Sequence, residues 1–452
     1  MSIRSQFSIR AASREPDWTE KVKLPNEANF RLKQVQVHEN SQPMLLAAIL
    51  FAGILTIWIP NRWALSLFQL SLFAFAGFRI VMHLLARRSI GWHPVALLLA
   101  SAALWGLVQV ATRRTIYEFR TLESVLDWIT NLAAFSLALE LNRGWMQRKR
   151  FLDAVLIFAA LLGIVSVFTV LTSPVGRVFW WFDVSNAATL GPFVYKNQYA
   201  AFVEAILPLA ILQAIRDRRR WLPHTLLAAM LFGSVVASGS RTGSALCLAE
   251  ILVIPAIAFA REQIDGRTLV KATLGSVIAM TLFTIVVGWQ VIWSRLQEPN
   301  PYELRWKLVQ SSLAMFHDVP HDVLWMGFGL GTWSMAYPGY ALFDDGTFVN
   351  QAHNDWLQWA VEGGIPLLLI MLAVAIWTIR PALQTLWGIG MCAVFLHCLI
   401  DYPMQQRPAL TAFFFALLGT LASQSGRANR ARKPADFPLF QQATSDLPNT
   451  VN

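Results

Sequence analysis

The residues around His353 are of the types found in catalytic sites. His353 is flanked by the amide side chains of Asn350 and Asn354 and is followed closely by Asp355. A neutral imidazole can take a proton from a hydroxyl group, so His353 is a candidate general base. The alternative is that His353 is a hydrogen-bonded structural residue. Asn354 is a candidate for binding the substrate beside it.

The chain after His353 predicts a membrane helix with a break in it. Residues 355–380 are mostly apolar and, at about 1.5 Å per residue, long enough to cross a bilayer. The sequence Gly363-Gly364-Ile365-Pro366 interrupts this helix and removes backbone hydrogen bonds that lipid cannot replace. We therefore expect protein or a water-filled cavity to cover the break, and we expect a functional site at its mouth.

Arg241 is the candidate phosphate ligand. It lies in a short connection between two apolar segments, next to the small residues Gly239, Ser240 and Gly243, which would let a ligand approach closely. A guanidinium group remains charged at physiological pH and can bind a phosphate through two parallel hydrogen bonds. The alternative is a structural ion pair between Arg241 and a loop carboxylate.

Arg305 is a second cation that could bind phosphate. It belongs to an amphipathic helix expected to run to about residue 317 and to lie on the membrane surface. Arg305 is either a solvated residue of that helix or a second phosphate ligand. The run 327–331 (Gly-Phe-Gly-Leu-Gly) follows, but without a strand–helix unit it is not a nucleotide-binding fingerprint.

Two further pairs of polar residues stand at the ends of apolar segments. Lys196 and Asn197 open one segment, where they could bind an anionic headgroup or, with neighbouring tyrosines, anchor the helix at the interface. His397 and Asp401 are four residues apart and therefore share a helical face. They could support the site around His353 or simply hydrogen-bond to each other.

Composition indicates the kind of protein that must position these residues. The chain is 55% hydrophobic and 14% charged, with 19 Trp and a mean hydropathy of +0.46. Apolar runs of about 20 residues recur along it, which is typical of an all-α, polytopic membrane protein. We expect about twelve spans, at residues 43–60, 64–86, 92–112, 121–141, 150–172, 197–215, 222–240, 242–261, 270–294, 356–380, 386–402 and 408–424.

The distribution of positive charge predicts the orientation in the membrane. With the N-terminus inside, the cytoplasmic segments carry 25 Lys and Arg residues and the opposite side carries 11. This bias places both termini in the cytoplasm and the long loop 295–355, with His353, on the other side. It also explains the net charge of +10 through membrane lipids, without nucleic acid. We expect cytoplasmic tails at 1–42, partly disordered, and at 425–452.

The cysteines and histidines give no reason to expect a metal, a cofactor or a disulfide. Cys247, Cys392 and Cys398 all lie in apolar segments and are expected to be small core residues. No second histidine or carboxylate stands at metal-ligand spacing from His353.

Taken together, these segments resemble the O-antigen ligase/polymerase superfamily of bacterial envelope enzymes. The resemblance covers about 190–420 and is strongest in order and spacing for the last two of four features. The features are Gly191 to Asn197 leading to Pro208; Ser238-Gly239-Ser240-Arg241; Arg305 followed by 327–331; and 352–358 with 362–366.

The resemblance implies an inverting, metal-independent glycosyltransferase in the bacterial inner membrane. Residues 43–424 would form its transmembrane domain, with a periplasmic loop at 295–355 that contains short helices. The donor would be an undecaprenyl-diphosphate-linked glycan, with His353 as general base and Arg241 and Arg305 on the diphosphate. The acceptor would be lipid A-core in an O-antigen ligase, another lipid-linked repeat in a polymerase, or a Ser or Thr side chain in a protein-glycosylating relative. The slight preference is for the ligase.

A secondary transporter for a small anion is the alternative from a different class. Broken helices and a buried arginine also occur in transporters. The predicted spans are nearly free of charge at their midplane, however, and the polar residues gather at one face. That distribution favours chemistry at a membrane surface.

Overall fold

The computed structural model describes residues 26–87, 91–184, 189–217, 219–287, 293, 297, 300, 302–317, 321–344, 346 and 348–431. The chain divides into two compact units, Met1–Gln42 and Pro43–Asn452. The fold and the site described below belong to the second unit. Most of the expected tail at 1–42, and the expected tail at 425–452 beyond residue 431, lie outside the described residues.

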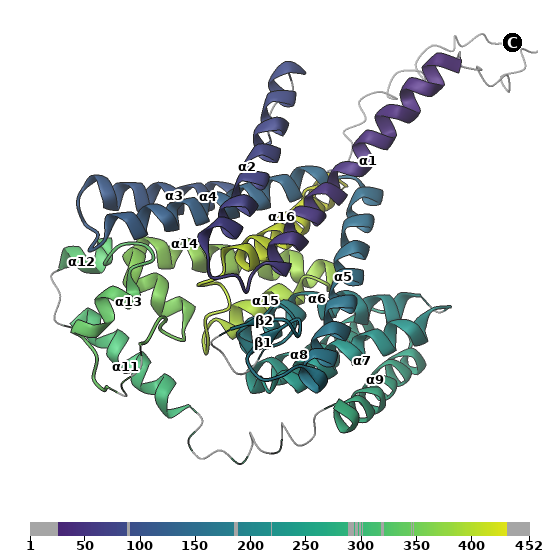
Figure 1. The fold of residues 1–452 in the computed structure, drawn as a ribbon. Coiled ribbons are helices and arrows are strands. Elements are labelled where there is room, and N and C mark those ends of the chain that lie inside the picture. The colour runs from purple at the N-terminus through teal and green to yellow at the C-terminus, as the bar shows by residue number, and fades with distance from the viewer. Residues whose placement is uncertain are drawn as a thin grey trace, which may run out of the picture. The chain divides into compact units, whose positions relative to one another are not determined.

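The described residues are almost entirely helical, as predicted (Figure 1). The strands β1 (Arg177–Val178) and β2 (Phe182–Asp183) form one short antiparallel hairpin. The helices are α1 (Asn26–Leu55), α2 (Arg62–Leu85), α3 (Pro94–Ala111), α4 (Glu118–Leu141), α5 (Trp145–Thr172), α6 (Lys196–Arg216), α7 (Trp221–Ser238), α8 (Arg241–Ala260), α9 (Gly266–Val287), α11 (Glu303–His317), α12 (His321–Met326), α13 (Trp333–Ala336), the 3-10 turn η1 (Tyr337–Gly339), α14 (Asp355–Thr385), α15 (Ile389–His397) and α16 (Pro408–Ala431).

Nine helices within the described ranges are long and apolar enough to cross a membrane. They are α2 to α8, α9 over Gly266–Ile285, and α14. Two further apolar helical stretches, Ser41–Leu55 and Pro408–Gln424, are shorter and coincide with the first and last predicted spans. The prediction of an all-α, polytopic membrane protein is confirmed.

The predicted span 386–402 differs from the structure in length. The helix there is α15, which has nine residues and therefore covers about 14 Å, roughly half of a bilayer's hydrocarbon core. After His397 the chain turns sharply, because the carbonyl oxygen of His397 accepts from the N–H groups of both Ile400 and Asp401 at 3.0 Å. The hydropathy pattern predicted a helix through this turn because most of the turn's residues are apolar.

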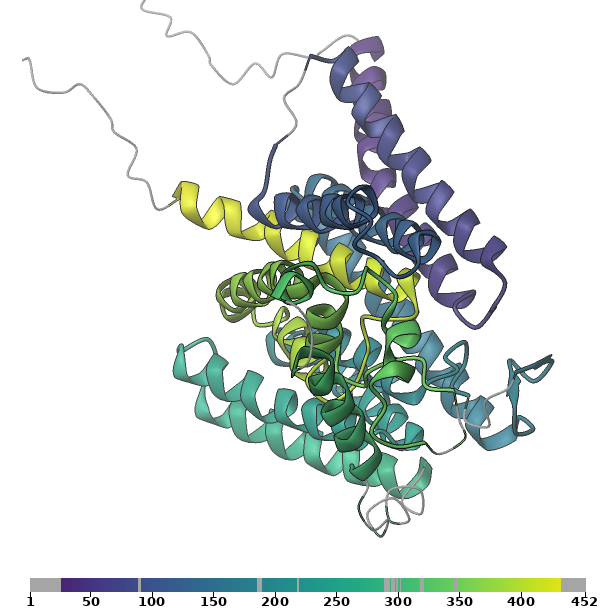
Figure 2. The same cartoon turned by 90° about the vertical axis from the view of Figure 1, so that its left-hand side faces the viewer.

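The helices of this unit pack around α6. Helix α6 contacts α7, α8 and α15, and 89% of its apolar window is buried inside the protein. A second group forms where α4 packs against α3 and α16, and α14 joins the two groups by contacting both α3 and α15 (Figures 1 and 2). Among the nine candidate spans, the one with the largest buried share therefore begins with the predicted site residues Lys196 and Asn197.

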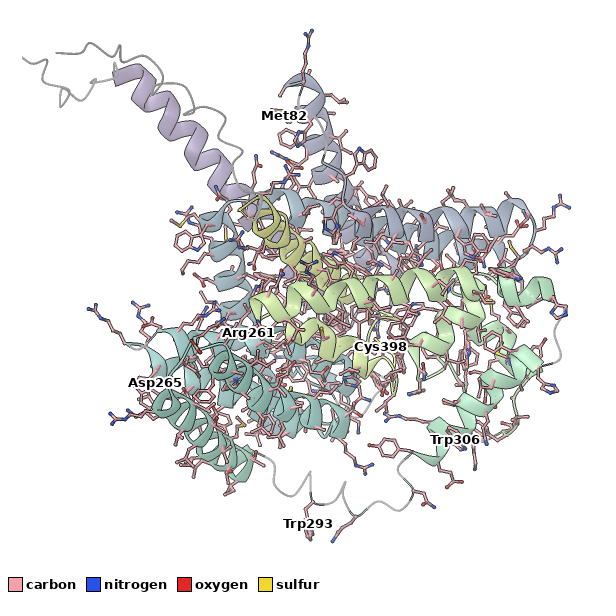
Figure 3. All side chains as sticks on the ribbon, turned by 180° about the vertical axis from the view of Figure 1, so that it is seen from behind. Met82, Arg261, Asp265, Trp293, Trp306 and Cys398 are labelled. Carbon is pink, nitrogen blue, oxygen red and sulfur yellow. The ribbon has the colours of Figure 1, made fainter. Side chains whose placement is uncertain are left out.

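Helix α11 confirms the predicted helix but buries its apolar stripe inside the protein. Leu308 and Met315, together with the serines between them, are buried. They pack in a small core cluster with Trp333 of α13 and Val361 of α14. The opposite side of α11 carries Trp306, which is exposed (Figure 3). These protein contacts replace the expected contact between this stripe and a membrane surface.

The three cysteines are free thiols. Cys247 and Cys398 are buried and Cys392 is half-buried. Cys398 lies in the interior, in the turn that follows α15 (Figure 3). Its carbonyl oxygen accepts from the N–H group of Asp355 at 2.9 Å, which ties this turn to the start of α14.

Candidate active site

His353 lies directly before α14 in a left-handed backbone conformation, with φ of 52°. Its Nδ1 atom is 3.5 Å from Oδ1 of Asp401 and 3.4 Å from the hydroxyl oxygen of Tyr195. The ring of Tyr402 packs edge-on against the imidazole, with ring centres 4.7 Å apart. The His353 side chain remains 24% exposed. Its Nδ1 atom is therefore turned toward a buried carboxylate, while part of the ring stays accessible.

Asp401 accepts hydrogen bonds from several side chains of this site. Its side chain is buried, and its Oδ2 atom accepts from Nη2 of Arg305 at 2.6 Å and from the side-chain amide of Asn197. The hydroxyl group of Tyr195 donates to both carboxylate oxygens, at 3.0 and 3.1 Å, and the N–H group of Tyr402 donates to Oδ1 at 2.9 Å. These four donor groups make five hydrogen bonds, and they come from α11, from the start of α6 and from the turn itself.

The donors keep Asp401 ionised. Burial by itself would raise the pKa of this carboxyl group, but the hydrogen bond from His353 and the charge of Arg305 together lower it to about 2. Burial and the neighbouring Asp401 charge raise the pKa of Tyr195 well above its usual value, so its phenol stays protonated and donates. The site thus holds a fixed negative charge behind His353.

Asn197 links Asp401 to the start of α8. Its amide nitrogen donates to Asp401, and its Oδ1 atom accepts from the hydroxyl group of Ser240 at 2.7 Å. Ser240 also caps α8, because its Oγ atom accepts from the N–H group of Gly243 at 3.2 Å. Arg241 is the first residue of that helix and is half-buried. A continuous set of hydrogen bonds therefore runs from the cap beside Arg241 to the carboxylate behind His353.

The start of α14 is fixed to the turn that carries Asp401. Asn354 caps α14 by accepting from the N–H group of Leu357 at 2.9 Å, and its amide donates to the carbonyl of Leu399 at 2.8 Å. The buried carboxylate of Asp355 accepts from the N–H group of Met404 at 2.9 Å. These bonds fix the backbone on both sides of His353 relative to the turn.

The break in α14 is covered by protein, as predicted. Gly364 has φ of 65° and ψ of −166°, which is not helical. The carbonyl of Gly363 accepts from the indole of Trp105 at 2.8 Å, and the carbonyl of Glu362 accepts from the side chain of Gln109 at 2.8 Å. Both donors lie on α3, which therefore satisfies the backbone groups that the break exposes.

The glycine run 327–331 supports the break from the other side. The N–H groups of Phe328 and Gly329 donate to the carbonyls of Val361 and Glu362, at 2.9 and 3.0 Å. The N–H group of Gly331 donates to the Glu362 carboxylate at 2.9 Å. These N–H groups donate to acceptors on α14 and so support it at the break. We therefore call residues 327–331 the brace of α14.

Comparison with known families adds the decisive observation. Residues 225–372 match the family model described as O-antigen ligase. Over this segment the chain is similar to the O-antigen ligase family. The predicted resemblance to that superfamily is confirmed, and the chain is a multi-pass membrane protein with an enzyme family's domain. No curated protein matches the chain.

The matched segment contains four of the predicted site residues, Arg241, Arg305, His353 and Asn354. In the structure Arg305 and His353 meet at Asp401, and Arg241 joins them through Ser240 and Asn197 as described above. The other members of this hydrogen-bonded set, Asn197 and Asp401, lie outside the matched segment. Packing therefore brings residues from both flanks of the matched segment into this hydrogen-bonded set.

His397, Lys196 and Asn354 have different surroundings in the structure. His397 is fully buried, and its Nδ1 atom is 2.8 Å from Oε1 of Glu204. Lys196 is the half-buried first residue of α6, beside Asn197. Asn354 uses its side chain as a helix cap. Of these three residues, His397 is the one that is closed off from any ligand at His353.

Sequence reasoning missed the part that Asp401 plays. The sequence offers Asp401 as half of a pair with His397 that supports the site or bonds within itself, but it does not pair Asp401 with His353 and Arg305. Tyr195 and Tyr402 were treated as interfacial residues or not considered. The available signal was a carboxylate next to Tyr402-Pro403 at the end of an apolar run, since a buried carboxylate needs donors from elsewhere. Within the described residues, no cluster of three or more metal-ligand side chains occurs.

Proposed function

We propose that the protein is a membrane glycosyltransferase that transfers a glycan from an undecaprenyl-diphosphate carrier to an acceptor hydroxyl group at the periplasmic face. We further propose that it is an O-antigen ligase, with lipid A-core as the acceptor. The observation that carries the proposal is the contact between His353 and the buried, ionised Asp401, which also binds Arg305, in a chain with a segment similar to the O-antigen ligase family.

His353 acts as the general base. Its Nδ1 atom faces Asp401, so the tautomer with a proton on Nδ1 donates to the carboxylate and leaves a lone pair on Nε2. Nε2 accepts the proton of the acceptor hydroxyl group as its oxygen attacks the anomeric carbon. Asp401 orients the ring and stabilises the imidazolium that forms. A positioned base of this kind contributes roughly 10²- to 10⁴-fold to the rate.

The two arginines act on the leaving group. The bond between the anomeric carbon and the diphosphate oxygen breaks, and its electron pair moves onto the diphosphate. Arg305 uses one N–H of its guanidinium on Asp401, which leaves other donors for a phosphate oxygen. Arg241 supplies the second positive charge. The diphosphate leaving group needs charge stabilisation more than a proton, and the two arginines supply that charge in place of a metal. The reaction is a single displacement, so the anomeric centre is inverted.

The test is a transfer assay with purified protein in liposomes that contain the undecaprenyl-diphosphate-linked glycan. Wild type and His353→Ala are compared with lipid A-core and with a second lipid-linked repeat as rival acceptors. Product on lipid A-core that is absent with His353→Ala supports the ligase. A ladder of longer lipid-linked glycans would instead make the protein a polymerase. No product on either competent acceptor would overturn the proposal and favour anion transport.

A further inference from the structure

A buried acid–base pair lies next to the site and takes no part in the steps above. Glu204 on α6 and His397 at the end of α15 both have side chains with 0% exposure. His397 Nδ1 and Glu204 Oε1 are 2.8 Å apart. Removing two such groups from water is costly unless each satisfies the other. The pair therefore fixes a specific contact between α6 and α15.

This pair is the second of two polar contacts between the same segments. Asn197 and Glu204 are seven residues apart on α6, which is about two helical turns, so they share one face. Asn197 binds Asp401, and Glu204 binds His397. The turn 397–401 is therefore held to α6 at its first residue as well as at its last.

The backbone of that turn transmits the position of His397 to Asp401. The N–H group of Asp401 donates to the carbonyl of His397 at 3.0 Å, and the N–H group of Ile400 donates to the same oxygen. The carbonyls of Cys398 and Asp401 in turn accept from the N–H group of Asp355, at 2.9 and 3.2 Å. A rotation or shift of His397 would displace Asp401 relative to the start of α14, where His353 lies.

Two glycines bring neighbouring helices directly onto Glu204. A Cβ atom at Gly390 of α15 would overlap the carbonyl oxygen of Glu204. A Cβ atom at Gly243 of α8 would overlap Ala200 and lie 3.2 Å from Oε1 of Glu204. Glu204 thus lies where α6, α8 and α15 meet. A larger residue at Gly390 or Gly243 would push these helices apart and move Glu204.

We infer that Glu204 is a positioning residue of the transfer reaction, because it holds His397 and so keeps Asp401 in place behind His353. The inference rests on the proposed function. Glu204 is enclosed and touches neither the donor nor the acceptor in this arrangement, so it is not a catalytic residue. What Glu204 supplies is a hydrogen-bond acceptor at a fixed place.

The experiment compares Glu204→Met with Glu204→Gln in the full-length protein. Methionine has a similar length but offers His397 no carboxylate or amide oxygen, whereas the glutamine Oε1 can still accept from Nδ1. We expect Glu204→Met to lower kcat at least tenfold while the KM for the donor changes less than threefold. We expect Glu204→Gln to restore kcat to within about threefold of wild type. Thermal melts in detergent establish that each variant is folded.

Glu250→Met is the matched control. Glu250 on α8 is also buried, and neither of its carboxylate oxygens has a hydrogen-bond partner among the described residues. The substitution removes a buried carboxylate without touching the contact between His397 and Glu204, and we expect wild-type kcat. His397→Asn and His397→Leu repeat the comparison from the other partner, since asparagine keeps a donor near Nδ1 and leucine does not.

The outcomes separate this inference from the proposed function. Transfer by wild type that is lost in His353→Ala supports the proposed function independently of Glu204. Glu204→Met with wild-type kcat, or Glu204→Met and Glu204→Gln with equal losses, would then overturn the positioning role alone. A wild-type protein that transfers to neither acceptor would overturn both.

Discussion

A histidine that acts as a base needs one nitrogen held and the other left accessible. At His353 the held atom is Nδ1, which faces Asp401, and the side chain remains 24% exposed. Asp401 meets this need because the hydrogen bond from His353 and the charge of Arg305 keep its pKa at about 2 although it is buried. In the proposed reaction these two residues therefore act as one unit.

Asp401→Asn tests that unit. The asparagine removes the negative charge that faces both Arg305 and His353, so the imidazolium formed during transfer loses its stabilising partner. We expect kcat to fall at least ~10²-fold. The measurement is donor-saturated transfer, and Gln406→Ala, at an exposed position of the same loop, is the control. Near-wild-type kcat in Asp401→Asn would contradict the pairing.

The same carboxylate predicts an acid limit on stability. The pKa of Asp401 is about 2 in the folded protein against a usual 3.8, so ionised Asp401 stabilises the fold above about pH 4. That contribution is lost as the pH falls from 4 towards 2. Thermal melts at pH 2 to 5 should show a fall in melting temperature over this window that is smaller in Asp401→Asn. Equal falls in both proteins would argue against a depressed pKa.

Arg241→Lys tests the phosphate role of Arg241. Lysine keeps the positive charge but loses the planar fork that binds two phosphate oxygens at once. We expect kcat/KM for the lipid-diphosphate donor to fall about 10- to 100-fold, corresponding to roughly 1.5–3 kcal/mol for a charge-assisted hydrogen bond. Arg261→Lys, at the opposite end of α8, is the control. Wild-type turnover in Arg241→Lys would count against the role.

At the scale of elements, the broken helix α14 is the piece that sets the position of His353. Its N-terminal part ends at the Gly363–Gly364 break, and α3 and the brace 327–331 satisfy the carbonyls there. The Glu362 carboxylate also binds Gln358, which accepts from the N–H group of Ala352 through its own amide oxygen. A displacement of the brace would therefore be transmitted through Glu362 and Gln358 to Ala352, next to His353.

Gly327→Ala tests this connection. Gly327 has φ of 72°, and a Cβ atom there would overlap the carbonyl oxygen of Glu362. We expect a loss of about 1–3 kcal/mol in stability and a lower kcat, since the break must shift to make room. Gly346→Ala is the matched control, because φ is 74° there and no atom lies within 4 Å of the added Cβ. Equal effects of the two substitutions would show that backbone strain alone is responsible.

At the scale of the whole molecule, the site is assembled from segments that are far apart in the chain. Asn197, Arg305 and Asp401 come from α6, α11 and the turn after α15. The matched O-antigen ligase segment, 225–372, supplies Arg305 and His353 but not the carboxylate between them. Activity should therefore depend on the packing of α6 and α15 against the family segment.

Orientation in the membrane is the prediction that belongs to this scale. The Lys and Arg bias places His353 and α11 on the periplasmic side and the loop between α6 and α7 in the cytoplasm. In intact cells, Trp306→Cys on the exposed side of α11 should react with a membrane-impermeant maleimide. Arg219→Cys should react only after permeabilisation. The reverse pattern would invert the proposed topology and place the site in the cytoplasm.

Much of the fold and part of the site followed from local patterns. The membrane class came from apolar runs, and the covered break came from Gly363-Gly364-Ile365-Pro366, because lipid offers no hydrogen bonds. The helix of Arg305 came from helical periodicity, whereas its apolar stripe was expected on the membrane surface and is buried inside the protein. These features depend on residues that are close together in the chain, so they can be predicted from the sequence.

Other features depended on packing between distant segments. Arg305 and Asp401 are 96 residues apart in the chain, and no local pattern pairs them. The hydropathy pattern predicted a full span at 386–402 where α15 has nine residues. Hydropathy does not show that His397 and Asp401 each bind α6, which forces a turn. The sequence alone determined the membrane class and predicted a site with one histidine and two arginines. Only the tertiary structure decided which carboxylate stands behind that histidine, because hydrogen-bond partners are chosen when the helices pack.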